Sequence, residues 1–329
     1  MKVFVTGATG FIGSEVARRL RARGDQVRAL VRNPAKATEL QAIGSELVAG
    51  ELGDLAAIRS GMGNCDAVIH GAAIYELGIP TSRRPAMYEA NVKGTENVLQ
   101  AALDHTVPKV VYISTVNAFG NTEGHIVDES HRHNERYVSY YDETKHKAHK
   151  VALDFIARGL PLVIVQPGGV YGPGDTSPQG RLIHQFLDGK LPAMMFPETG
   201  FNLVHRDDVA EGILLCLDKG KAGEAYVLGG QITTIGEAIK VLGRVAGRKP
   251  PRLTLPSIMI KAAAPLGPLI GPAIGQGPHL GEIIKAADNV TYWAKDDKAR
   301  NELGYSPRGL AQGFHDTLEV EGRLPQGSR

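Results

Sequence analysis

The sequence contains a tyrosine and a lysine four residues apart, Tyr141 and Lys145, at the start of a segment with helical periodicity. Side chains at this spacing lie one turn apart on the same face of a helix. A phenol loses its proton near pH ~10 in water, which is too high for ready proton transfer at neutral pH. A neighbouring ammonium group stabilises the phenolate and lowers its pKa. We therefore expect Tyr141 to act as an acid or base towards a substrate oxygen, with Lys145 lowering its pKa.

Two hydroxyl side chains, Ser114 and Thr115, follow the apolar run 110–113, which has the composition of a buried strand. Ligands of open α/β sheets bind beside the carboxyl ends of the strands. These hydroxyls are therefore expected to hydrogen-bond the reacting oxygen and to complete an oxyanion-type site. The alternative is a local turn in which they only cap the end of the strand.

The first apolar run leads directly into a glycine-rich turn, TGATGFIG at residues 6–13. Gly7 permits a tight turn, Gly10 lets the backbone approach a pyrophosphate, and Gly13 lets a helix pack on the strand. The strand-helix-strand context of about 30 residues is the one that a dinucleotide-binding turn requires. The alternative is a structural turn without a ligand. The expected cofactor contacts here are Gly7, Thr9, Gly10, Phe11, Ile12 and Gly13.

The end of the second apolar run indicates which dinucleotide binds. NAD sites usually place an acidic residue there, whereas NADP sites tolerate or supply an arginine. Residues 29–36 contain no acid, and Arg32 offers a planar guanidinium suited to a 2′-phosphate, with Lys36 adding a second positive charge. The alternative is that both are solvated surface cations. NADP(H) is therefore the preferred cofactor, with NAD(H) as the second choice.

Short apolar runs alternate with helical patterns through the first half of the chain, which is typical of a parallel sheet with helices on both faces. The predicted strands are 3–6, 27–31, 46–49, 67–70, 109–114 and 162–166, and the clearest helical patterns are 15–22 and 92–103. The fold class is therefore α/β, a Rossmann-type doubly wound parallel sheet with a smaller, discontinuous C-terminal substrate-binding region.

The composition changes after residue 166, where PGGVYGPGDTSPQG must form a loop. A strand at 202–205 and a helix opened by Asp207 or Asp208 are then expected, and a strand at 225–228 is expected to rejoin the sheet. The predicted NADP-binding domain comprises 1–166 and 201–229, and the substrate-binding region comprises 167–200 and 230–329. The Pro- and Gly-rich segment 256–281 has no interpretation.

Charge and composition exclude several classes of protein. The net charge of +2, from 37 Lys and Arg against 35 Asp and Glu, gives no electrostatic footprint for nucleic acid. Cys65 and Cys216 suggest neither a disulfide framework nor a metal site, so a reducing cytoplasm fits best. The apolar segment 258–274 contains Lys261 and three prolines, which disfavours a membrane span, and the N-terminus lacks the pattern of a signal peptide.

Several motifs occur together and in order along nearly the whole chain. They are TGATGFIG at 6–13, HGAA at 70–73, ANVKGT at 90–95, ISTVNAFG at 113–120, YDETK at 141–145, VYGPGD at 170–175, HRDDVA at 205–210 and YWAKDDKARNELGY at 292–305. In this combination the sequence resembles the extended short-chain dehydrogenase/reductase superfamily, also called the NAD-dependent epimerase/dehydratase family.

The resemblance implies roles for individual residues. Tyr141 would be the acid/base, Lys145 would also hold the nicotinamide ribose, Thr115 would be the catalytic hydroxyl with Ser114 beside it, and Asn91 would support the site from a neighbouring helix. Further cofactor contacts would be Ala72, Ala73, Pro167, Gly168, Gly169, Val170, and Glu51 with Leu52, where Glu51 replaces the family's usual Asp near the adenine. Family positions also suggest Arg181, His184, Phe201, Asn202 and His205 as substrate contacts, although His205 is equally suited to a structural hydrogen bond.

Two motif positions and one segment bear on the substrate class. Similar nucleotide-sugar epimerases grip the diphosphate with two arginines, and the corresponding positions here are Phe201 and Lys285. The segment VRALVRNPAK at 27–36 is similar to the NADP-preferring dihydroflavonol and cinnamoyl-CoA reductases, and the whole chain is similar to bacterial epimerase-like proteins called hopanoid-associated. The hypothesis is an NADP(H)-dependent reductase that converts a ketone or aldehyde to an alcohol. The alternatives are a nucleotide-sugar epimerase or dehydratase with tightly bound NAD(P), and an NADP-sensing regulator without turnover.

Two further expectations concern histidines and assembly. The pairs His131 with His133 and His146 with His149 lack a completing cluster of ligands, so they are expected to be solvated, and no metal site is predicted. The family also implies a homodimer formed through helices near 91–104 and 141–158. The remaining partner would be a small-molecule carbonyl compound or a sugar-derived substrate.

Overall fold

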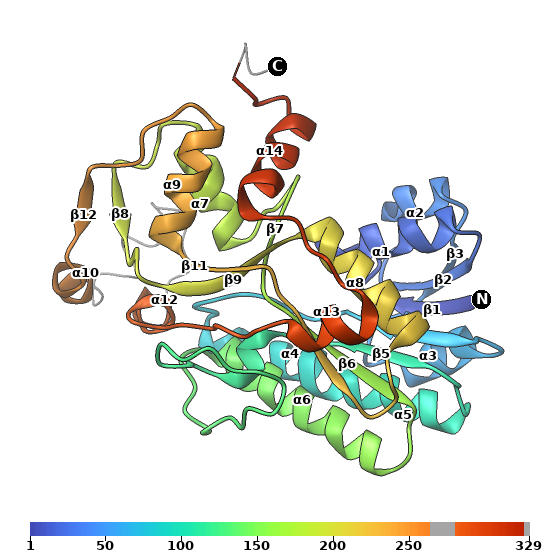
Figure 1. Ribbon diagram of the computed structural model, residues 1–329. Helices are drawn as coiled ribbons and strands as arrows, with labels where there is room; N and C mark the ends of the chain where they lie inside the picture. The colour runs from blue at the N-terminus through green and yellow to red at the C-terminus, as the bar shows by residue number, and fades with distance from the viewer. Residues whose placement is uncertain (264–279, 326–329) are drawn as a thin grey trace.

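A seven-stranded parallel sheet forms the centre of the computed structural model, which describes residues 1–263 and 280–325. Its order is β10-β6-β5-β4-β1-β2-β3, so the chain reverses direction across the sheet between β1 and β4 (Figure 1). Such a switch point opens a crevice at the carboxyl ends of the strands. The strands are β1 (Lys2–Thr6), β2 (Gln26–Val31), β3 (Glu46–Ala49), β4 (Ala67–His70), β5 (Val110–Ile113), β6 (Leu162–Pro167) and β10 (Ala225–Leu228). The predicted doubly wound sheet is confirmed.

Helices cover both faces of this sheet (Figure 1). Helices α1 (Phe11–Ala22), α8 (Arg206–Lys219) and α13 (Asp297–Leu303) pack on one face, and α3 (Leu55–Met62), α5 (Gly94–Asp104) and α6 (Tyr140–Ala157) pack on the other. Shorter elements are α2 (Thr38–Ala42), α4 (Arg84–Tyr88), single 3-10 turns at Pro34–Lys36, Thr81–Arg83 and Val116–Phe119, and a π-helical turn at Glu89–Lys93.

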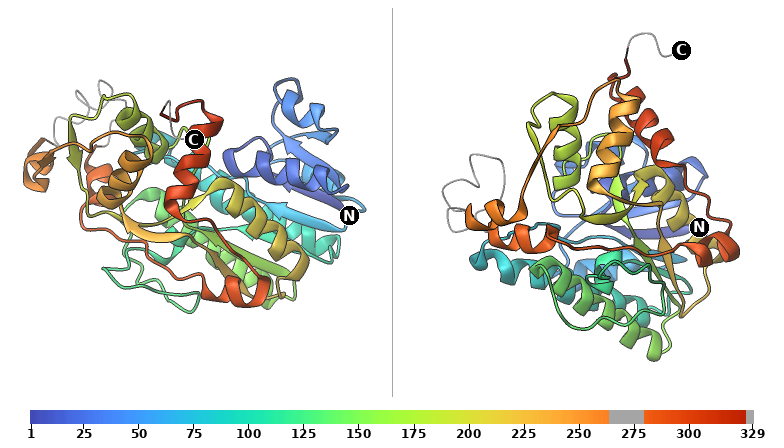
Figure 2. Two further views of the ribbon diagram at one scale, coloured as in Figure 1. Left: turned by 45° about the horizontal axis from the view of Figure 1, so that its top comes forward. Right: turned by 60° about the vertical axis from the view of Figure 1, so that its left-hand side comes forward.

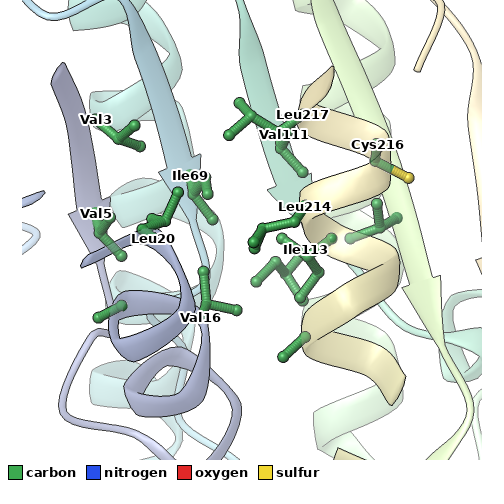
Figure 3. Packing of buried hydrophobic residues seen from close by; sticks show 14 of the residues in the cluster. Val3, Val5, Val16, Leu20, Ile69, Val111, Ile113, Leu214, Cys216 and Leu217 are labelled. Carbon is green, nitrogen blue, oxygen red and sulfur yellow. The ribbon is translucent and has the colours of Figure 1, made fainter. Parts of the chain in front are cut away.

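The alternation of side chains along each strand divides the core into two clusters. Val3 and Val5 of β1 pack with Leu20 of α1 and Leu214 of α8 on one face (Figure 3). Phe4, between them, points to the opposite face and joins the cluster of α3, α5 and α6. Because both faces are covered, the strands are continuous apolar runs rather than alternating ones.

The smaller region lies beside the sheet (Figure 2). It contains a three-stranded sheet of β7 (Gly169–Tyr171), β9 (Gly200–His205) and β11 (Gln231–Thr234), and a two-stranded sheet of β8 (Ala193–Met195) and β12 (Leu253–Leu255). Its helices are α7 (Pro178–Leu187), α9 (Ile235–Val245), α10 (Ser257–Ala263), α12 (Leu280–Ala287) and α14 (Leu310–Val320). Most of the uninterpreted segment 256–281, including Gly267, lies outside the described residues.

The predicted N-cap of the helix in segment 201–229 is corrected. Strand β9, which precedes this helix, pairs with β7 and β11 and lies outside the large sheet. Helix α8 is capped by neither aspartate: the Asp207 N–H donates to His205 Nδ1 at 3.3 Å, which makes His205 the N-cap. Asp208 is occupied elsewhere, since it accepts hydrogen bonds from Arg308. Only the final strand of the segment, β10, is part of the large sheet.

No helix in residues 1–263 and 280–325 has the length and apolar character needed to cross a bilayer.

The packing of the glycine turn predicts a stability effect. A Cβ atom at Gly13 would lie 2.1 Å from the Gly7 carbonyl oxygen, so Gly13→Ala must push α1 away from β1. We expect the free energy of unfolding to fall by about 1–3 kcal/mol, measured by urea denaturation. Gly53→Ala is the control, because its added Cβ meets only the end of the Glu51 side chain, at 4.0 Å. Equal effects of the two substitutions would contradict the packing argument.

Candidate active site

A cleft of about 670 Å³ is lined by residues from the carboxyl edge of the large sheet and from the smaller region. It brings together most of the residues predicted for the site. They are Gly7, Gly10, Phe11, Ile12, Gly13, Ala73, Ser114, Thr115, Tyr141, Lys145, Pro167, Gly168, Gly169, Val170, Arg181 and Phe201. Residues far apart in the sequence therefore meet where the sheet changes direction.

The glycine turn has the geometry that a dinucleotide phosphate requires. Gly7 has a positive φ of 78°, and a Cβ there would lie 2.7 Å from the Ala72 nitrogen. Helix α1 begins at Gly10 without a side-chain cap and without an acidic residue in its first turn, so its N-terminal N–H groups and positive end are available to an anion. The residues present therefore fit the pyrophosphate of a nicotinamide dinucleotide.

The residues expected at the adenosine end lie at the same sheet edge but outside the lining of the cleft. Arg32 directly follows β2, and both it and Lys36 are exposed, with no ion pair to any residue that the structure describes. Thr9 and Glu51 are also exposed, whereas Leu52 packs against Gly94 of α5. The two cations are therefore free to meet an added phosphate.

The tyrosine and lysine lie in the first turns of α6 and are almost fully buried, with 8% and 4% of Tyr141 and Lys145 exposed. Ser139 starts the helix, because its Oγ accepts a hydrogen bond from the Asp142 N–H at 3.1 Å. The Lys145 ammonium donates to the Ile113 carbonyl at 3.0 Å and lies 3.5 Å from the Tyr112 hydroxyl. The end of β5 thus anchors the lysine directly.

The expected lowering of the Tyr141 pKa is wrong for the protein alone. Burial raises the pKa of the Tyr141 phenol well above its ordinary value, and Tyr75, Asp142 and Tyr112 raise it further. Burial also lowers the pKa of Lys145 to about 8. Desolvation disfavours the charged form of each group. Tyr141 is consequently held as a neutral phenol, the form that can donate a proton.

The hydroxyls at the end of β5 lie in the cleft, and one of them also caps a turn. Both line the cleft, and Thr115 also caps the turn 116–119 by accepting the Asn117 N–H at 3.2 Å. The Thr115 hydroxyl in turn donates to Asn117 Oδ1 at 3.1 Å, and the Ser114 hydroxyl lies 3.1 Å from His149 Nδ1. Neither partner was predicted, although His149 lies one turn beyond Lys145 on α6.

Asn91 supports the site from outside the cleft. Its amide accepts the Ile74 N–H at 2.7 Å and donates to the Ile74 carbonyl and to the Thr144 hydroxyl, both at 3.0 Å. This fixes the loop after β4 against α6. The loop carries Tyr75, whose ring lies edge-on to Tyr141 at 4.7 Å between centroids and which also lines the cleft. Sequence motifs gave no signal for Tyr75.

A buried histidine, His70, connects the cofactor side of the site to Asn91. Thr95 donates its hydroxyl proton to the Asn91 carbonyl at 2.7 Å, so it must accept from His70 Nε2 at 3.0 Å. His70 Nδ1 then accepts from the Thr6 hydroxyl at 2.7 Å, and Thr6 accepts the Ala72 N–H at 3.3 Å. This direction of hydrogen bonding requires a neutral imidazole, and burial lowers the pKa of His70 to about 3.

Three of the suggested substrate residues do not line the cleft. Asn202 is buried and exchanges hydrogen bonds with the Ala294 backbone, His205 caps α8, and His184 pairs with Glu321 at 3.3 Å. Asn202 and His184 thus tie the smaller region to the C-terminal part of the chain, whereas His205 serves its own helix. Arg181 and Phe201 are the two of this group that face the cleft.

The expectation of solvated histidines is also corrected. The rings of His133 and His146 lie 4.1 Å apart and both are half-buried, while His131 lies edge-on to Phe119. Burial lowers the pKa of both His133 and His149 to about 4. His133 belongs to the loop before α6 and packs on His146 of that helix, a contact that the spacing of the histidines did not indicate.

The neutral His70 predicts a pH dependence of stability. Its pKa of about 3 in the folded protein lies below the unfolded value of 6.5, so the unfolded chain binds more protons between these limits. The free energy of unfolding should therefore fall as the pH drops below about 6.5, with a slope from this group of up to about 1.4 kcal/mol per pH unit.

The corresponding experiment is urea unfolding from about pH 7 to about pH 4. His70→Gln keeps one donor and one acceptor but cannot titrate, so its slope should be shallower than that of the wild type. His105→Gln, at an exposed position, is the control and should leave the slope unchanged. An unchanged slope in His70→Gln would contradict the neutral imidazole.

Comparison with known proteins shows the same fold and similar sequences. A Synechocystis protein provisionally named dihydroflavonol 4-reductase is 33% identical over 325 residues, covering 96% of this chain and 93% of its own. A 4-hydroxy-2-methyl-3-oxo-4-farnesyl-3,4-dihydroquinoline-1-oxide ketoreductase from Stigmatella aurantiaca is 32% identical and covers 100% of this chain and 98% of its own.

Solved structures show the same fold. The crystal structure of gox2253 has a TM-score of 0.83 and 34% identity, covering 98% of this chain and 99% of its own. A dTDP-glucose 4,6-dehydratase, DesIV from Streptomyces venezuelae, solved with NAD bound, has a TM-score of 0.78 and 26% identity and covers 97% of this chain and 96% of its own. Residues 3–229 match the model of the NAD dependent epimerase/dehydratase family. With its glycine turn, its buried Tyr141 and Lys145 and these relatives, the chain belongs to the NAD-dependent epimerase/dehydratase family and is an NAD(P)-dependent enzyme of the extended short-chain dehydrogenase/reductase type.

Proposed function

We propose that this enzyme is an NADP(H)-dependent carbonyl reductase that converts a ketone or aldehyde to an alcohol. The observation that carries the proposal is the character of the substrate half of the cleft. Its walls include the rings of Tyr75, Phe201 and Tyr292, and the last two stack with their centroids 5.6 Å apart. Such walls favour an uncharged compound with an apolar or aromatic part.

The charges around the cleft support the same substrate class. Arg181 is the cation on the substrate side among the described lining residues, and Asp175 and Glu76 line the cleft with it. Lys285 does not supply a second cation, because its ammonium donates to the Tyr137 carbonyl at 2.7 Å. A dianionic diphosphate would therefore meet as much negative as positive charge, which disfavours a sugar nucleotide.

Residues of this chain donate the proton to the substrate and orient its carbonyl group. Tyr141 donates the phenolic proton to the carbonyl oxygen as the alcohol forms, and Lys145, anchored on Ile113, stabilises the phenolate that remains. To hold the carbonyl oxygen near the phenol, Ser114 donates its hydroxyl proton to that oxygen, and Thr115 must turn its proton from Asn117 Oδ1 towards it. The reduced nicotinamide dinucleotide, when bound on the glycine turn, supplies the hydride.

An epimerase or dehydratase with a retained cofactor is the second candidate. It is favoured by the similarity to DesIV, which was solved with NAD bound. A reductase consumes one NADPH per alcohol formed, whereas an epimerase leaves the cofactor unchanged over the full reaction. The third alternative, a regulator without turnover, is disfavoured because Tyr141 and Lys145 are both present in the cleft. The homodimer and the cytoplasmic location stay predictions.

The role of Tyr141 predicts a specific loss. Tyr141→Phe should lower kcat for carbonyl reduction by about 10²–10⁴-fold while NADPH still binds, because only the proton donor is removed. Tyr140→Phe is the matched control, since the Tyr140 side chain does not line the cleft. The measurements are NADPH oxidation by absorbance and NADPH binding by fluorescence. Full activity in Tyr141→Phe would rule out this acid.

The cofactor preference depends on Arg32. Arg32→Ala should raise KM for NADPH by about tenfold, because a charge-assisted contact to the 2′-phosphate is lost, and should leave KM for NADH unchanged. Arg59→Ala, which removes an exposed arginine paired with Asp104, is the control. Equal changes for the two cofactors would contradict recognition of the 2′-phosphate by Arg32.

A further inference from the structure

A fully buried carboxylate, Asp142, lies next to Tyr141 in the first turn of α6, with 0% of its surface exposed. It forms no ion pair within the described part of the chain. Its oxygens accept two side-chain hydrogen bonds, from Asn117 Nδ2 at 2.9 Å and from the Tyr292 hydroxyl at 2.8 Å. A buried, unpaired charge is costly, so its retention in this position needs an explanation.

Both donors belong to the walls of the cleft. Asn117 Oδ1 accepts from the Thr115 hydroxyl at 3.1 Å, and the Asn117 backbone N–H donates to the same hydroxyl at 3.2 Å. Tyr292 lies next to Thr291, which bridges to Gly200 of β9, and its ring stacks on Phe201. Asp142 therefore connects the catalytic hydroxyl at the end of β5 to the C-terminal segment that closes the substrate side.

The ionisable groups around Tyr141 and Asp142 determine whether Asp142 raises or lowers the pKa of Tyr141. Tyr141 is faced by the phenols of Tyr75 and Tyr112 and by Asp142, while Lys145 lies one turn further along α6. Asp142 is faced by Tyr292, Asn117 and Ser139, and by Glu282 of α12. Glu282 is itself paired with Arg84 at 3.0 Å. A carboxylate beside a phenol disfavours the phenolate.

We propose that Asp142 is a positioning residue: it orients Thr115 through Asn117, and its negative charge keeps Tyr141 protonated up to higher pH. This inference rests on the proposed function, because a reductase needs Tyr141 as a phenol that donates its proton to the substrate. Burial raises the pKa of Asp142 to about 6, and the hydrogen bonds from Tyr292 and Asn117 oppose that rise, so the group is charged at neutral pH. No step of the reaction passes through Asp142 itself.

The test is the pH dependence of carbonyl reduction in Asp142→Asn. The amide keeps the size of the side chain and can still accept from Asn117, but it has no charge. Because Lys145 titrates first, with a pKa of about 8, the limb to follow is the one at higher pH, where Tyr141 loses its proton, and it should move down by about one unit. Oxidation of the product alcohol, which needs the phenolate, should begin at a pH lower by the same amount.

Two controls separate this effect from a structural one. Glu143→Gln removes the same charge from the next residue, which is half-exposed and paired with Lys147, and should leave the profile unchanged. Tyr292→Phe removes a hydrogen bond but keeps the Asp142 charge, so it should not move the alkaline limb downward. A shift in Glu143→Gln equal to that in Asp142→Asn, or no shift in Asp142→Asn, would overturn the proposal.

A second readout does not depend on turnover. Phenolate formation is followed by ultraviolet absorbance in the wild type and in Asp142→Asn, each compared with its Tyr141→Phe counterpart to isolate Tyr141. Tyr141 should ionise at lower pH when Asp142 is neutralised. Identical curves, including the absence of ionisation in both before unfolding, would contradict the inference. If no ketone is reduced but this shift is seen, the proposed function fails while the role of Asp142 stands.

Discussion

The site depends on a buried ammonium group. Lys145 is 4% exposed, and within the described residues no carboxylate forms an ion pair with it. Its charge is supported by the Ile113 carbonyl, at 3.0 Å, and by the Tyr112 ring, whose centroid lies 5.2 Å from Nζ. Because an unpaired buried cation is costly, the pocket favours an anion next to it. In the proposed reaction, the phenolate left when Tyr141 donates its proton would supply that negative charge.

The two halves of the site are held in register by one buried hydrogen-bond chain. The chain starts at the Ala72 N–H beside the glycine turn, passes through Thr6, His70 and Thr95, and ends at the Asn91 carbonyl. The Asn91 amide then holds the loop that carries Tyr75. These hydrogen bonds join the glycine turn to the loop whose Tyr75 faces Tyr141.

Local patterns were sufficient for the strands of the large sheet and for the glycine turn. The runs of Val and Ile gave the sheet, and the spacing of Gly7, Gly10 and Gly13 located the turn, because both depend on short stretches of backbone. Patterns were insufficient where a side chain's partner is distant in sequence. Asn202 bonds to Ala294 rather than to a ligand, and Asp142 bonds to Tyr292, 150 residues away. The pKa of Tyr141 was misjudged for a related reason, since its burial depends on tertiary packing.

The most direct test of the central claim follows the hydride itself. The enzyme is given NADPH labelled with deuterium on the transferred position and a panel of aryl and alkyl ketones, and the alcohols are examined by mass spectrometry. The account predicts an alcohol that carries one deuterium for each NADPH oxidised. Epimerisation of a sugar nucleotide with the labelled cofactor unchanged, and no deuterium in any alcohol, would contradict it.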